Sequence, residues 1–172
     1  MNVPRMILIF LLTCPGLLTA QEQDPVLTGP ITVEQLLDLP GWFGEEFLSY
    51  QPDPQYLTQI PAEAEGVTIV CVLGTWCPDS RREVPRMLRL LQVTHIAPER
   101  MQMIGVDRNK QSPGGEAAPY GVDRVPTFIL YRDGKELGRI VETPFASLEK
   151  DMLGILLNPV RDGDVGRNVD GE

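Results

Sequence analysis

A nearly uninterrupted apolar run at residues 67–73 most constrains the fold, because a helical pattern follows it almost at once. The run is rich in valine and isoleucine, which predicts a central strand buried on both faces. Residues 78–92 then predict a helix, with Pro78 tolerated in its first turn. Its apolar positions follow helical spacing and form one core-facing stripe: Val84, Met87, Leu88 and Leu91. A strand that turns directly into a helix indicates an α/β fold.

The remaining elements complete a mixed sheet. Residues 101–106 form a second apolar strand, and residues 127–131 and 136–141 flank a turn sequence that favours a β-hairpin. Residues 145–157 predict a final helix. The order of strand, helix, strand, hairpin and helix indicates a mixed central sheet with helices on both faces.

Residues 1–20 resemble a signal peptide. Arg5 precedes the apolar run 6–12, and residues 18–20 end in the small residue Ala20, after which we expect cleavage. This predicts export, to a periplasm or outside the cell, and no transmembrane segment after cleavage. Two alternatives leave the protein tethered to a membrane: an uncleaved N-terminal anchor, or a lipoprotein cysteine at Cys14.

Residues 21–60 are predicted to form a leader and a helical extension. We expect residues 21–30 to be a loose polar leader and residues 32–60 to hold short helices, the first opened by a capping box of Thr32 and Gln35. The remainder, residues 61–157, is predicted to be the main domain. Residues 158–172 have almost no apolar side chains, which predicts a disordered tail.

Charge and cysteine content exclude several classes of function. The formal net charge of −9 argues against nucleic-acid binding, which needs clustered positive charge. The single histidine, His95, is isolated, so we expect no metal site and no cofactor. Loss of residues 1–20 leaves two cysteines, Cys71 and Cys77, which are too few for a structural disulfide framework.

Cys77 lies where the buried strand turns into the helix. The unpaired N–H groups and the positive dipole end of the helix favour a thiolate there. The hydroxyl of Ser80, one turn later, could donate a hydrogen bond to the sulfur, and Arg81 and Arg82 add positive charge. The alternative is an inert core cysteine beside arginines on a solvated helix face.

Four motifs in order then resemble the thioredoxin superfamily: Trp76-Cys77-x-x-Ser80, the helix proline Pro85, Val125-Pro126-Thr127 and the hairpin turn at residues 132–135. The resemblance covers roughly residues 61–157. It implies a thioredoxin-like fold in which Pro126 forms a cis peptide bond that faces Cys77. It also implies that Trp76, Val125 and Pro126 line a groove for substrate.

The departures from this family narrow the chemistry. Ser80 replaces the second cysteine, so the chain cannot release itself from a mixed disulfide in the usual way. Cys71 stands at the position of the family's buried acid, and Met103 at that of its lysine. We interpret Cys71 as a core residue, with an unusual resolving thiol as the alternative.

The sequence therefore predicts an exported monothiol thiol–disulfide oxidoreductase or isomerase. Its partners would be protein or small-molecule thiols and disulfides, such as glutathione, and the protein itself would be a monomer by default. A non-catalytic peptide-binding module with the same fold is the alternative. A thiol peroxidase ranks last, because Thr75 is only two residues before Cys77.

Overall fold

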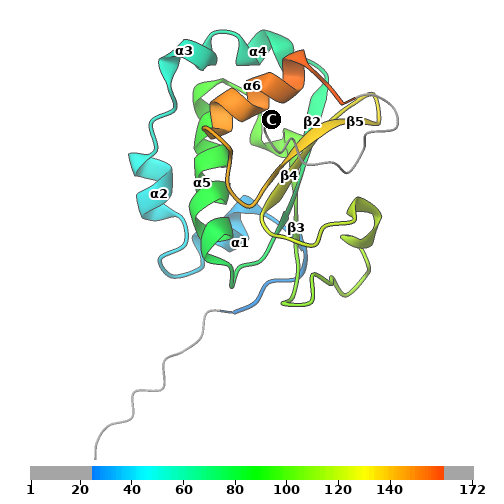
Figure 1. Cartoon of the computed structure of the whole chain (residues 1–172). Helices are drawn as coiled ribbons and strands as arrows, with labels where there is room; N and C mark the ends of the chain where they lie inside the picture. Colours follow the sequence, from blue (N-terminus) through cyan, green and yellow to red (C-terminus); the bar gives the residue numbers. More distant parts are fainter. Residues whose placement is uncertain (1–24, 161–172) are drawn as a thin grey trace, which may run out of the picture.

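The computed structural model describes residues 25–160 and contains one five-stranded sheet. The strands are β1 (Gly29–Ile31), β2 (Val67–Leu73), β3 (Met101–Gly105), β4 (Thr127–Arg132) and β5 (Lys135–Val141), in the order β1-β3-β2-β4-β5 (Figure 1). The predicted signal peptide, and the predicted tail beyond residue 160, lie outside the described residues.

The sheet is mixed, as the sequence predicts. β2 pairs in parallel with β3 and antiparallel with β4, which forms a hairpin with β5. Asp133 and Gly134 close that hairpin with φ angles of 52° and 76°, the backbone that a two-residue turn of the favoured hand requires. Strand β2 thus lies at the centre of the sheet, and its carboxyl end is followed by the turn before Cys77.

Six α-helices are described: α1 (Val33–Leu37), α2 (Gly44–Ser49), α3 (Pro54–Leu57), α4 (Ile60–Glu63), α5 (Pro78–Val93) and α6 (Leu148–Leu157), with 3-10 helices η1 (Pro98–Arg100) and η2 (Ala118–Tyr120). The capping box of Thr32 and Gln35 is confirmed. Helix α6 starts three residues later than predicted, because Ser147 caps it. Among residues 25–160, no helix has the length and apolar character needed to cross a membrane.

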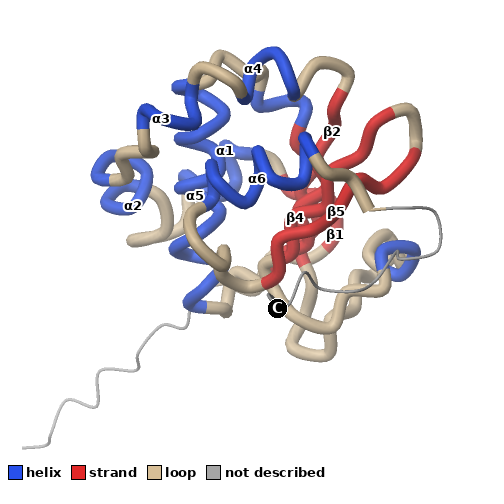
Figure 2. Tube along the Cα trace, turned by 45° about the horizontal axis from the view of Figure 1, so that its top comes forward, coloured by secondary structure: helices blue, strands red, loops and turns tan. Residues whose placement is uncertain are grey.

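The two faces of the sheet are covered differently. Ile69, Cys71 and Leu73 of β2 belong to the larger core cluster, which helices α1, α4, α5 and α6 complete. Val70 and Val72 point to the other face and join a smaller cluster. Figure 2 shows α1–α6 gathered on one side of the sheet. The thioredoxin-like mixed sheet flanked by helices is confirmed, but mainly the loop around η2 covers the second face.

The prediction of a loose leader over residues 21–30 is wrong at the end of that segment. Gly29 and Ile31 pair with Gly105 and Met103, so this segment adds the edge strand β1 to the sheet. Three residues that include a proline and a glycine carry no recognisable strand pattern. Pairing with β3 and burial of Ile31, rather than local propensity, therefore make this strand.

Polar contacts fasten the helical extension to the main domain. The Tyr50 hydroxyl donates to a carboxylate oxygen of Glu149 at 2.6 Å, and the Asp53 N–H donates to the other oxygen at 2.9 Å. Desolvation alone would raise the pKa of Glu149, but these hydrogen bonds together hold it below its usual value. The extension is thus tied to the first turn of α6 through an ionised, buried carboxylate.

We expect Gly105→Ala to lower the free energy of unfolding by about 1–3 kcal/mol, since a Cβ there would collide with the Leu27 carbonyl oxygen and the Ile31 side chain. Urea unfolding measures this loss. The control Gly154→Ala adds the same methyl group in open space on α6 and should be neutral or stabilising. Equal effects of the two substitutions would contradict the close packing of the leader on β3.

Tyr50→Phe should destabilise the protein by about 1–3 kcal/mol at neutral pH, because Glu149 loses a hydrogen bond to its charged form. A carboxylate whose folded pKa lies below its unfolded pKa stabilises above the unfolded value, 4.5, and this contribution disappears as pH falls through the folded pKa. The difference between variant and wild type should therefore shrink below about pH 4.5.

Urea unfolding on both sides of that pH measures the effect. Tyr56→Phe is the matched control, because Tyr56 is also half-buried and its hydroxyl has no recorded hydrogen bond among the described residues. A destabilisation by Tyr50→Phe that stays constant with pH would show that Glu149 is not the group involved.

Candidate active site at Cys77

Cys77 is the N-cap of α5, a helix of 16 residues. Its backbone is extended, with φ −90° and ψ 124°, because Pro78 follows and restricts the residue before it. The Cys77 N–H donates to the Gly74 carbonyl at 2.9 Å, and its own carbonyl accepts from the Arg81 N–H at 3.1 Å. The turn thus holds the side chain at the N-terminus of α5.

The sulfur of Cys77 lies beside the loop that precedes β4. Sγ is 3.1 Å from the Val125 carbonyl oxygen, to which the thiol donates. Val125 and Pro126 are both buried, and the peptide bond between them is cis. Cys77 itself is only 7% exposed. The structure therefore brings together three of the residues that the sequence singles out, all of them buried.

Ser80 is fully buried and serves the turn rather than the sulfur. Its hydroxyl oxygen accepts a hydrogen bond from the Gly74 N–H at 3.2 Å. Between residues 25 and 160, no recorded hydrogen bond joins Ser80 to Cys77, which corrects the expected contact. The physical reason is that the Gly74 N–H at the end of β2 is buried and needs an acceptor, which Ser80 supplies from one turn inside α5.

Trp76 stands half-buried at the edge of this site. Its indole Nε1 donates to the Val106 carbonyl at 3.0 Å, which fixes the ring at the carboxyl end of β3. A Cβ at Gly74 would lie 2.7 Å from the ring, so only glycine leaves room for the indole. The cationic groups of Arg108 and Lys110 lie 5.1 and 5.4 Å from the ring centroid.

The two arginines after Ser80 have different environments. Arg81 Nε donates to the Thr75 carbonyl at 3.1 Å, so its guanidinium is held against the turn. Arg82 instead pairs with Asp79 at 2.7 Å and with Glu83 at 2.6 Å. Two carboxylates therefore compensate the charge of Arg82, whereas the Arg81 side chain contacts the turn that carries Cys77.

Cys71 lies in the larger core cluster and Cys77 in the smaller one, on opposite faces of the sheet. Both thiols are free, and burial raises the pKa of the fully enclosed Cys71 thiol far above its usual range. The structure therefore favours the core interpretation of Cys71. A thiol kept neutral on the far face of a central strand is unsuited to resolving a disulfide at Cys77.

Sequence reasoning missed Thr75 and Trp42. The buried Thr75 hydroxyl accepts from the Leu27 N–H and donates to the Pro25 carbonyl, both at 3.1 Å. Its own carbonyl accepts from the Trp42 indole N–H at 3.1 Å. Two separate segments, residues 25–27 and the one that carries Trp42, thus converge on the residue two before Cys77. The only local signal was a tryptophan in a region otherwise predicted to be peripheral.

The residues described do not assemble a metal centre. Across residues 25–160, no group of three or more histidine, cysteine, aspartate and glutamate side chains is arranged to hold a metal ion. The arrangement at Cys77 is suited to chemistry by a single sulfur held at a helix N-terminus.

Comparison with known proteins finds a distant relative. The chain is 29% identical over 96 residues to a protein named thioredoxin from Chlamydia pneumoniae, an alignment that spans 55% of this chain and 83% of the relative. No family model matches the chain. A crystal structure of a protein of unknown function from Pseudomonas aeruginosa, 12% identical, covers 74% of this chain and 96% of its own, but its TM-score of 0.37 is too low to support an argument. The first of these likenesses suggests the thioredoxin-like superfamily.

Trp42→Phe should loosen the turn that carries Cys77, because the Thr75 carbonyl loses one of its two side-chain donors. We expect a loss of about 1 kcal/mol in stability and faster hydrogen exchange at the amides of Trp76 and Cys77. Phe47→Leu is the control: it removes aromatic volume from a side chain packed against the same cluster, without a contact to the turn. Equal exchange at Cys77 in the two variants would contradict the role of Trp42.

Proposed function

We propose that the chain is an exported thiol–disulfide oxidoreductase or isomerase that uses one cysteine, Cys77. The observation that carries this proposal is the position of its sulfur, at the N-terminus of α5 and 3.1 Å from the Val125 carbonyl. The printed name of the Chlamydia pneumoniae relative supports the same class of chemistry. The pattern of residues 1–20 supports export, to a periplasm or outside the cell.

In the proposed reaction, the Cys77 thiolate attacks one sulfur of a substrate disulfide. A bond forms between Cys77 and that sulfur, the substrate S–S bond breaks, and the second substrate sulfur leaves as a thiolate. Electrons and atoms balance in this exchange without a cofactor. The attacking sulfur would lie at the N-terminus of α5, and the adjacent Val125 and Pro126 would position the substrate chain.

Release of the substrate must come from another molecule or another part of the substrate. Ser80 carries no thiol, and Cys71 is enclosed on the opposite face of the sheet. A second substrate thiolate that attacks the mixed disulfide completes an isomerisation. A small thiol such as glutathione would instead attack the Cys77 sulfur, which frees the reduced substrate and forms a Cys77–glutathione disulfide. A second glutathione then cleaves that disulfide, which regenerates Cys77 and releases oxidised glutathione. This requirement favours isomerisation or deglutathionylation over net dithiol reduction.

One observation favours the second candidate, a non-catalytic binding module. The 7% exposure of Cys77 leaves little room for a disulfide to approach the sulfur. A groove made by Trp76, Val125 and Pro126 could hold an extended peptide without a reaction. Cys77→Ser separates the candidates, since a binding module would retain its partner whereas a thiol enzyme would lose turnover.

Incubation with oxidised glutathione should yield one adduct, at Cys77, which mass spectrometry of peptides can locate. Cys71 should remain unmodified, because it is fully buried and its pKa is raised by burial. Cys77→Ser should abolish the adduct in the folded domain. An unmodified Cys77 after prolonged incubation would contradict the proposed function.

The matched variant Ser80→Cys tests whether the lack of a second thiol at position 80 limits release of the adduct. A second thiol one turn after Cys77 should attack the mixed disulfide and release the glutathione without an added reductant. Its adduct should therefore be short-lived, whereas the wild-type adduct should persist until a thiol is added. A wild-type adduct that decays as fast as that of the variant would show that Ser80 does not limit release.

A further inference from the structure

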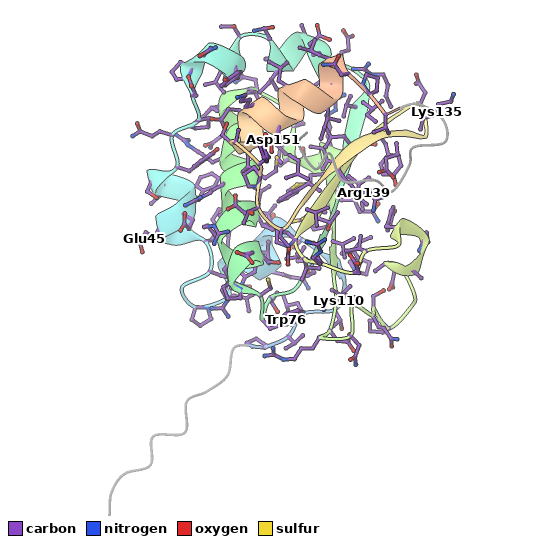
Figure 3. The ribbon with its side chains drawn as sticks, viewed as in Figure 1. Glu45, Trp76, Lys110, Lys135, Arg139 and Asp151 are labelled. Atoms are coloured by element: carbon purple, nitrogen blue, oxygen red, sulfur yellow. The ribbon has the colours of Figure 1, made fainter. Side chains whose placement is uncertain are left out.

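Two cations lie against the tryptophan beside the candidate nucleophile. Arg108 and Lys110 follow β3, and both lie over the ring of Trp76, at 5.1 and 5.4 Å from its centroid. Because the Trp76 N–H is bonded to the Val106 carbonyl, the ring holds both cations at the same end of the sheet as Cys77. Figure 3 shows Trp76 and Lys110 at this end and Lys135 at the other.

Within the described residues 25–160, neither Arg108 nor Lys110 has a carboxylate within ion-pair distance. Lys110 donates instead to the Arg108 carbonyl at 3.2 Å. The nearest acid in sequence, Asp107, uses one carboxylate oxygen to accept the N–H groups of Asn109 and Gln111. Two like charges are therefore gathered on one ring and left available to a ligand.

The two cations beside Trp76 contrast with the charge of the chain as a whole. Its formal net charge is −9. The acid in the first turn of α5, Asp79, already pairs with Arg82. The surface next to the sulfur is thus cationic and aromatic within a mainly acidic protein.

We propose that Trp76, Arg108 and Lys110 form a subsite for acidic residues of a protein substrate, next to the disulfide that Cys77 attacks. This inference rests on the proposed function and names its substrate class. Carboxylates beside the substrate cysteine would pair with Arg108 and Lys110, while the apolar part of the segment contacts the indole. The attraction raises the local concentration of acidic substrates and weakens as salt screens it. Repulsion from the acidic remainder of the protein would confine such a segment to this subsite.

The test uses three peptide disulfides that are identical except for the residues beside the cysteine, which are glutamate, glutamine or lysine. Their rates of mixed-disulfide formation with Cys77 should follow that order at low salt. Each cation should contribute roughly a two- to fivefold difference, as exposed ion pairs do. Added salt should reduce the spread of rates.

The double variant Arg108→Gln/Lys110→Gln should make the three rates nearly equal, while the rate for the glutamine peptide stays within about twofold of wild type. Arg100→Gln/Lys135→Gln is the matched control, since it removes one arginine and one lysine at the opposite end of the sheet. This control should keep the order of rates. A preference for glutamate that survives the Arg108/Lys110 double variant would overturn the subsite.

The outcomes separate this inference from the function on which it rests. Equal rates for the three peptides with wild-type protein would overturn the subsite and leave the thiol chemistry standing. Failure of all three peptides to react would overturn the proposed function and the subsite together. Rates of mixed-disulfide formation are also compared between oxidised glutathione and its neutral ester. A charge preference seen with that pair but absent from the peptides would overturn the assignment to a protein substrate.

Discussion

The hydrogen bonds of Thr75 are the constraint on which the site depends. Its buried hydroxyl joins the Leu27 N–H and the Pro25 carbonyl, and its carbonyl binds the indole of Trp42 and the guanidinium of Arg81. All of these contacts fix the chain between a central strand and a long helix, two residues before Cys77. A reactive side chain at such a turn needs this support, because a small displacement of the turn would move the sulfur away from the Val125 carbonyl.

The local parts of this fold could be predicted from the sequence, whereas the long-range contacts could not. The spacing of apolar residues and the turn residues predict β2, α5 and the β4–β5 hairpin, because neighbouring residues determine the burial pattern and backbone geometry of these elements. Strand β1 escaped prediction, since its partner β3 lies more than seventy residues away. Cys77 shows the same difference between local and long-range contacts. Its place at the start of a helix follows from the local sequence, whereas the hydrogen bond from Trp42 to the turn before it does not.

The two cysteines show how position, rather than residue type, sets the chemistry of a thiol. One residue step along β2 reverses the face to which a side chain points, so Cys71 faces the helices and is sealed. Cys77 lies past the end of the strand, at a helix N-terminus with a carbonyl partner. Cys71 is the titratable side chain of β2, and its burial keeps the thiol neutral.

The path of the chain into and out of the domain has a practical consequence for handling it. Pro25 meets the fold at Thr75, beside the sulfur, whereas Val160 leaves it bonded to Leu137, toward the turn between β4 and β5. These points lie at opposite ends of the sheet (Figure 1). A bulky fusion partner on the amino side would lie close to the turn that carries Cys77. Immobilisation through the carboxyl side would instead leave that turn facing away from a solid support, which suits experiments that test the proposed function there.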